Sequence, residues 1–161
     1  MAAAAFRRSV EIPEDLEALR RFHGHLGVYV TVGLRMGAIG RRAFGHYKGL
    51  RATVRSRGEP PMLCVVDGVQ FSSGCTMGKG NIAVVVAEEP EVLFEKEGNR
   101  LRIALQPGWR ERIDREMSKE AELEQSLFYH RLPEADLFDI SEGGPHEPGT
   151  VHGTADGTRT Q

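Results

Sequence analysis

Apolar residues in the first third of the chain recur at helical spacing. Pro13 begins the first such stretch, since proline in the first turn of a helix sacrifices no useful N–H group, and Gly24 ends it. The next stretch, 26–44, combines strand-forming valines with three glycines at helical intervals. Glycines along one helix face allow another backbone to approach closely, whereas the same glycines would weaken a strand. We therefore predict helices at 13–24 and 26–44.

The pattern then changes to short apolar runs separated by turn residues, which is typical of strands. These runs predict strands at 52–57, 62–70 and 81–87, a hairpin of 92–96 and 102–105, and a short strand at 137–140. Before the last strand, the charged and Ala/Leu/Glu-rich stretch 109–131 predicts a helix. The sequence thus indicates an α+β fold in a single domain at residues 1–140. Residues 141–161, rich in Gly, Thr, Pro and Glu, predict a disordered tail.

The composition of the 161 residues is that of a globular protein, with 40% hydrophobic and 27% charged residues. A net charge of −2 argues against a nucleic-acid-binding protein. No segment approaches the roughly 20 apolar residues that span a membrane, and the apolar opening Met1–Ala5 is too short for a signal peptide. We expect a cytoplasmic protein, in which thiols stay reduced and can serve as ligands or nucleophiles.

Two segments carry candidate chemistry, and the first is His23-Gly24-His25, placed where the first helix ends. A glycine between two histidines lets the backbone direct both imidazoles toward one point. Together with a thiolate from Cys75, they would form a three-ligand tetrahedral site with an open position, which is the catalytic type of zinc site. We therefore predict one transition metal ion, with zinc favoured and nickel or iron as alternatives, bound by His23, His25 and Cys75.

The second segment is the glycine-rich loop 73–81, which contains Cys75 and Lys79. Lys79 would lower the pKa of Cys75 toward the thiolate that binds metals or attacks electrophiles. We expect these two residues to be the catalytic ones. A backbone of this kind can also curl around an anion and present amide N–H groups to it. The residues expected to bind a cofactor or small anionic ligand in this way are Gly74, Thr76, Gly78, Gly80 and Asn81. The alternative is a flexible turn with a partly buried thiol.

Two further residues are given simpler roles. Cys64 lies in the apolar run Met62–Val66, so we assign it to the core, where a free thiol behaves as a small hydrophobe. Asp67 is either a turn residue before Gly68 or a carboxylate that orients one of the histidines from behind.

The two candidate segments are also where the sequence resembles a known family. Phe22-His23-Gly24-His25-Leu26, then Gly33-Leu34-Arg35-Met36-Gly37, then Gly74-Cys75-Thr76-Met77-Gly78-Lys79-Gly80-Asn81 resemble the core domain of the formylmethanofuran dehydrogenase E-subunit family. The resemblance spans about residues 15–140. It implies a mixed β-sheet of about five strands flanked by α-helices, and a metal-binding site built from the His-Gly-His and Cys-Thr segments. Some members carry a C-terminal zinc finger, and this sequence has no cysteine cluster after Cys75 for one.

This sequence departs from the family pattern at one position. Many relatives have His-Gly-His-x-Cys-Pro, whereas Gly27 and Val28 follow Leu26 here. A thiol available to those relatives is therefore missing, which bears on metal affinity and on any reaction that needs two cysteines.

Three functions are compatible with these features. The first is a metal-binding protein or enzyme that acts on a small one-carbon or anionic compound. The second is a non-catalytic accessory protein that handles metal or cofactor for a molybdenum or tungsten oxidoreductase. The third is a metal-free enzyme with a cysteine nucleophile and a histidine base. We also expect a homodimer, because the family resemblance implies one and because Gly33, Gly37 and Gly40 form a face suited to close helix contact.

Overall fold

The computed structural model describes residues 10–144. Helices and strands are interspersed along the chain, and their order gives the α+β class that the sequence predicts. The elements are α1 (Glu14–His23), α2 (Val28–Phe44), β1 (Arg51–Ser56), the 3₁₀ turn η1 (Met62–Cys64), α3 (Val65–Ser73), η2 (Met77–Lys79), β2 (Ile82–Val86), β3 (Glu91–Lys96), β4 (Asn99–Leu105), α4 (Trp109–Glu116), α5 (Glu122–Arg131), α6 (Glu134–Leu137) and β5 (Phe138–Gly143).

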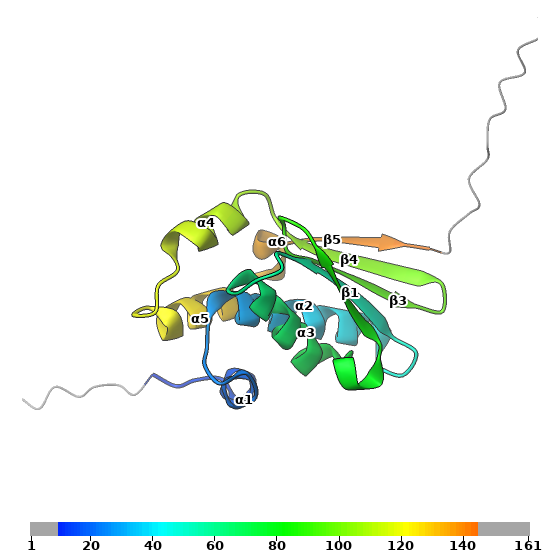
Figure 1. Ribbon diagram of the computed structural model, residues 1–161, viewed down its shortest axis with the longest axis horizontal. Coiled ribbons are helices and arrows are strands. Elements are labelled where there is room, and N and C mark those ends of the chain that lie inside the picture. The colour runs from blue at the N-terminus through cyan, green and yellow to red at the C-terminus, as the bar shows by residue number, and fades with distance from the viewer. Residues whose placement is uncertain (1–9, 145–161) are drawn as a thin grey trace, which may run out of the picture.

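The five strands form one mixed sheet in the order β2-β1-β3-β4-β5. β1 and β2 are parallel and are joined through α3, whereas the other neighbours are antiparallel. Alternate residues of the central strands, such as Val54, Val92 and Phe94, are fully buried. The long helix α2 and the shorter α3 lie together on this face of the sheet (Figure 1). The mixed five-stranded sheet flanked by helices is therefore confirmed.

The glycines of α2 allow the close packing that the sequence predicts. A Cβ atom on Gly33 would lie 2.1 Å from the Val65 carbonyl oxygen of α3, and one on Gly40 would lie 2.3 Å from the Phe94 ring of β3. Gly68 of α3 is the reciprocal position, because a Cβ there would lie 2.2 Å from the Val30 carbonyl oxygen. This face is thus occupied within one chain, so it gives no support to a dimer.

Three element predictions differ from the structure. The stretch 62–70 is helical rather than a strand, because its buried Val65, Val66 and Val69 lie at helical spacing around Gly68. The helix predicted at 109–131 is two helices, and β5 continues to Gly143 inside the segment predicted as tail. Residues 145–161 lie outside the described part of the chain.

The side chain of Gln125 bridges the break between α4 and α5. Gln125 donates from Nε2 to the Glu116 carbonyl oxygen, and its Oε1 accepts from the Ser118 amide. The connection therefore follows a defined path, and it forms one wall of a cavity. Within residues 10–144, no helix combines the length and the apolar character needed to cross a bilayer.

Candidate functional site

The imidazole of His23 is held by a carboxylate from another helix. Gly24 ends α1 in the left-handed conformation, with φ of 100°, and leaves His23 at the last position of the helix. Its Nδ1 lies 2.6 Å from Oδ2 of Asp67, which is in the first turn of α3. Because a carboxylate accepts hydrogen bonds, Nδ1–H is the donor. Of the two roles predicted for Asp67, the structure therefore confirms the one that orients a histidine.

The other ring nitrogen of His23 is buried and unsatisfied. Nε2 has no hydrogen-bond partner among the described residues, and the side chain is only 10% exposed. With the proton on Nδ1, Nε2 carries the lone pair that a metal ion or a proton would take. A buried polar atom without a partner is costly, which makes Nε2 of His23 a candidate ligand position.

His25 lies beside His23 and has the same arrangement of ring nitrogens. The two ring centroids are 4.7 Å apart. Nδ1 of His25 is 2.6 Å from the Leu26 carbonyl oxygen, which can only accept, so this nitrogen also carries the proton and Nε2 carries the lone pair. His25 is more exposed than His23, and Glu122 Oε1 lies 3.6 Å from its Nδ1. The structure thus brings the two predicted histidines together.

Both histidines line a cavity of about 320 Å³. Its walls come from the start of α2, from the turn before η1 and from the α4–α5 connection. The remaining lining residues are Gly27, Val28, Tyr29, Val30, Pro60, Pro61, Cys64, Met117, Ser118, Lys119, Glu122 and Gln125. Most of this surface is apolar, and the polar groups gather at the histidines and along the α4–α5 connection. Such a cavity suits a small ligand with one polar end.

The structure places the two cysteines differently from the sequence prediction. Cys75 is fully buried in the core cluster, and its Sγ lies 3.7 Å from the Leu50 carbonyl oxygen. It follows the last turn of α3, whereas Asp67 is in the first turn, and nine helical residues span about 13 Å. Cys64 is half-buried and lines the cavity with the histidines, so its assignment to the core alone is corrected.

The predicted ligand set is therefore not assembled as expected. In the described part of the chain, no three His, Cys, Asp or Glu side chains are grouped so that they could hold one metal ion. Cys64 itself packs against both core clusters, and as the N-cap of α3 it also reaches the cavity. The apolar composition around a cysteine does not show which side of a helix its thiol occupies. The prediction for Cys64 was therefore incomplete.

The main-chain amides of the glycine-rich loop 73–81 donate hydrogen bonds to other groups of the protein. The Thr76 amide donates to Asn81 Oδ1, the Met77 amide to Gln70 Oε1 and the Cys75 amide to Ser73 Oγ. The Lys79 and Gly80 amides donate to carbonyl oxygens of the same turn. The donors predicted to hold an anion are thus largely engaged. Gly74 and Gly80 serve left-handed turns, whereas Gly78 has no other atom within 4 Å of a Cβ position.

The sequence predicted that Lys79 lowers the pKa of Cys75, but in the structure this pKa is raised. Burial raises the pKa of the Cys75 thiol, and this effect outweighs the hydrogen bond to Ser73 and the nearby Lys79 charge. The Lys79 ammonium instead lies 4.9 Å from the centre of the Tyr47 ring, a cation–π distance. Asn81 Nδ2 donates to the Leu50 carbonyl oxygen and so fixes the start of β2. The residues of this loop therefore have structural roles. The loop lies at the opposite end of α3 from the histidines.

Thiol reactivity tests the corrected placement. We expect iodoacetamide to label Cys64 at least about tenfold faster than Cys75 in the native protein, because Cys64 reaches the cavity and Cys75 is sealed in the core. Burial, with a contribution from Asp67, raises the pKa of the Cys64 thiol, so its labelling rate should continue to increase above the usual thiol pKa of 9.0. Mass spectrometry of each cysteine peptide over a pH series measures both effects. Faster labelling of Cys75 would contradict the structure.

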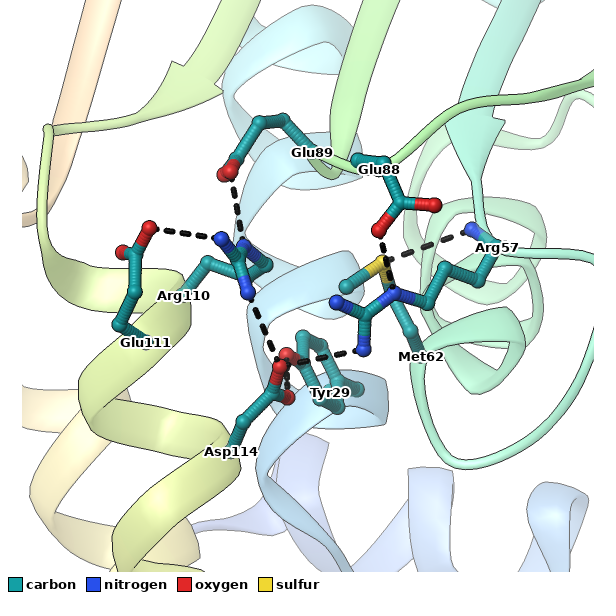
Figure 2. Close-up of polar contacts among 8 residues, drawn as sticks. All are labelled: Tyr29, Arg57, Met62, Glu88, Glu89, Arg110, Glu111 and Asp114. Carbon is teal, nitrogen blue, oxygen red and sulfur yellow. Dashed lines mark hydrogen bonds and ion pairs between the residues drawn. The ribbon is translucent and has the colours of Figure 1, made fainter.

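A polar cluster surrounds the hydroxyl of Tyr29, one of the residues that line the cavity (Figure 2). The Tyr29 hydroxyl donates to Asp114 of α4, and burial followed by this hydrogen bond raises the pKa of Tyr29. Arg57 and Arg110 both donate to the other oxygen of Asp114. The cluster attaches α4 to the start of α2, because Tyr29 belongs to α2 and Asp114 to α4. It thereby positions the α4–α5 connection, which lines the same cavity as Tyr29. The sequence analysis missed it, since these residues are far apart along the chain.

Comparison with known proteins finds a family and a solved structure that match most of this α+β domain. Residues 22–139 match the profile of the family described as "FmdE, Molybdenum formylmethanofuran dehydrogenase operon". A tungsten formylmethanofuran dehydrogenase FmdE-like protein from Syntrophus aciditrophicus has the same fold, with a TM-score of 0.55 and 20% identity over 90% of this chain and 78% of that one. A probable S-adenosyl-L-methionine-binding protein of Archaeoglobus fulgidus is 33% identical over 69 residues, which are 39% of this chain and 18% of that protein.

The fold and the paired histidines thus define a compact core domain of the FmdE type. The chain belongs to the FmdE family, because the match covers well over half of its length and includes the histidine and glycine-rich segments. It spans less than a fifth of the Archaeoglobus protein, so what that protein binds says nothing direct about this chain.

Proposed function

We propose that this chain is a cytoplasmic accessory protein for a molybdenum- or tungsten-dependent formylmethanofuran dehydrogenase system, and that it binds one divalent transition metal ion at the histidine cavity. The Nε2 atoms of His23 and His25 would be the ligands, with the Cys64 thiolate as the third candidate. When bound, the metal ion would supply a Lewis acid to a small molecule in the cavity. The family match supports the accessory role.

One observation carries the metal proposal: the buried and unpartnered Nε2 of His23, backed by Asp67 at 2.6 Å on Nδ1. A carboxylate on the far nitrogen is the usual partner of a metal-binding imidazole, because it fixes the tautomer and raises ligand basicity. His25 supplies a second nitrogen of the same tautomer from the neighbouring ring. Imidazole and thiolate ligands suit zinc, nickel and iron, and zinc is the ion we favour.

The same geometry argues against a metal-free thiol enzyme. A cysteine nucleophile needs its imidazole base within hydrogen-bond reach. Nε2 of His23 has no such partner among the described residues, even though Cys64 lines the same cavity. Cys75, the nucleophile expected from the sequence, is closed off in the core. The two imidazoles and Cys64 line one cavity but do not form a three-ligand group among the described residues, so the proposed metal ion would have to draw their side chains together.

Metal analysis of tag-free protein tests this proposal. We expect about one zinc ion per chain after equilibration and removal of excess metal. His23→Ala and His25→Ala should each lower zinc affinity at least about tenfold, and Asp67→Asn should lower it by a similar or smaller factor by releasing the His23 ring. His46→Ala is the matched control, because it removes an exposed imidazole from the α2–β1 connection.

Zinc retention in the histidine and cysteine variants shows which side chains bind the metal ion. Full zinc retention in both His23→Ala and His25→Ala would reject the site. Loss in Cys64→Ser but not in Cys75→Ser would identify the third ligand, and the reverse would restore the set predicted from the sequence. The accessory role is tested by adding the zinc-loaded chain to a formylmethanofuran dehydrogenase preparation and measuring its activity, with the His25→Ala variant as the inactive comparison.

A further inference from the structure

Acidic residues are missing from two long segments that meet at one end of the molecule. No Asp or Glu lies between Glu17 and Glu59, or between Asp67 and Glu88. The α2–β1 connection, residues 45–50, belongs to the first of these segments, and η2 belongs to the second. Both lie at the end of the molecule away from α4 (Figure 1). Cations at this end therefore have few carboxylates with which to pair.

Three cations and a histidine gather around one tyrosine in this region. The Lys79 ammonium and the central carbon of the Arg41 guanidinium lie 4.9 Å and 5.5 Å from the centre of the Tyr47 ring. The two charges are therefore no further apart than roughly the Debye length of 0.1 M salt, about 10 Å. His46 stacks on the same ring with the centroids 4.5 Å apart, and Lys48 follows in the chain and is exposed. We call these five residues the basic surface.

The basic surface is held in place without carboxylates. Arg41 donates to the Ser73 carbonyl oxygen, and the Lys48 amide donates to Nδ1 of His46. Most arginines elsewhere in the described chain pair with a carboxylate, whereas within residues 10–144 no ion pair includes Arg41, Lys48 or Lys79. Like charges held this close repel one another, so an anionic partner would relieve a cost that the chain carries alone.

The shape and the side chains of the basic surface suit a protein partner. Small molecules bind in concave sites, and among the described residues none of these five lines the histidine cavity or the hollows beside α1, α5 and β4. Tyr, Met and Arg are enriched at protein interfaces, and Met77, in the same turn as Lys79, is 68% exposed. A nucleic-acid-binding domain usually carries a net positive charge, whereas this chain carries −2. An acidic protein segment therefore fits best.

We propose that the basic surface is where this chain docks an acidic segment of a partner protein. Carboxylates of that segment pair with Arg41, Lys48 and Lys79, and its apolar side-chain atoms pack against the exposed ring of Tyr47. Charges at such a surface mainly raise the association rate and select the partner. The inference is independent of the metal site, because Arg41 contacts Ser73 at the end of α3 that lies away from the histidines.

Fluorescence anisotropy with a labelled glutamate-rich peptide tests the proposal on the full chain. Because the whole chain carries −2, its overall charge repels this peptide, and only a local surface can bind it. We expect binding that weakens at least about tenfold between about 0.05 and 0.3 M salt, and no binding of a matched peptide with glutamine in place of glutamate. Lys48→Glu and Lys79→Glu should each raise the dissociation constant at least about fivefold. NMR shift changes on peptide addition should concentrate at residues 41–51 and 74–81.

Arg115→Glu is the matched control, because it makes the same change of charge at an exposed position of α4 and should change the dissociation constant less than about twofold. Circular dichroism confirms that each variant is folded, and zinc content equal to that of the parent separates this test from the metal test. Peptide binding that is absent at low salt, or weakened equally by Arg115→Glu, would overturn the proposal. Tighter binding of a single-stranded oligonucleotide of equal charge would instead assign the surface to nucleic acid. Displacement of the peptide by inorganic phosphate, where sodium chloride of equal ionic strength has no effect, would reject a protein partner as well.

Discussion

Gly68→Ala is expected to destabilise this protein by about 3 kcal/mol or more, although alanine in a helix is normally favourable by roughly 0.5–1 kcal/mol. A Cβ atom at this position would lie 2.2 Å from the Val30 carbonyl oxygen and 2.4 Å from the Leu34 amide nitrogen. Both are main-chain atoms of α2 and cannot rotate away. α2 and α3 would have to separate along their whole contact, and with them the helical layer beneath the sheet.

Thermal and denaturant unfolding measure this effect. A loss of that size corresponds to a decrease in Tm of about 10 °C or more for a domain of this size. Gly78→Ala is the control, because no atom other than its chain neighbours lies within 4 Å of a Cβ there. It should change stability by less than about 1 kcal/mol. If Gly68→Ala were as stable as the parent, the close contact between α2 and α3 would be wrong.

Gly27→Cys is expected to strengthen zinc binding at least about tenfold, equivalent to about 1.4 kcal/mol. Position 27 is the N-cap of α2 with φ of −174°, an extended conformation that any residue adopts. A Cβ there would lie 3.8 Å from Cε1 of His25, an ordinary contact, so the new thiol has room inside the cavity. The N-terminal end of a helix also favours a thiolate. A further ligand closes the site, so any turnover found for the parent protein should be lost.

Melting in chelator and in zinc measures this effect. The variant should melt like the parent in chelator and at a higher temperature than the parent in zinc. Gly78→Cys is the control for nonspecific zinc binding by an added thiol, since it lies in the other candidate segment. If zinc affinity is unchanged in folded Gly27→Cys, position 27 faces away from the metal, and the departure from the family pattern has no chemical meaning.

Sequence reasoning reached the fold because local patterns determine most of it. The glycine spacing of α2 predicted both a helix and a close backbone contact, and the main chain of α3 does lie directly against Gly33. The prediction failed at 62–70, where a short run of valines fits a strand or a helix equally well. Only packing against α2 selects the helix there, and packing is a property of the whole chain.

The site was predicted in part for the same reason. His23 and His25 are close in sequence, so their proximity could be inferred directly, and Asp67 could be named as a partner because its chemistry suits the task. Which thiol reaches the histidine cavity depended on which end of α3 faces the histidines. The sequence offered Cys75 in a distinctive loop and Cys64 in a plain apolar run, and the orientation of the helix reversed the expected choice.

The adjacency of Asp67 and Gly68 in α3 has a consequence for binding thermodynamics. The carboxylate that orients His23 is next in sequence to the glycine at which the α2 and α3 backbones come into close contact, so the imidazole is held from that helix contact. Its rotational freedom is lost when the chain folds and not when a ligand arrives. An ion bound as we propose would meet a ring that is already oriented, and we expect its preferred coordination geometry to contribute to selectivity.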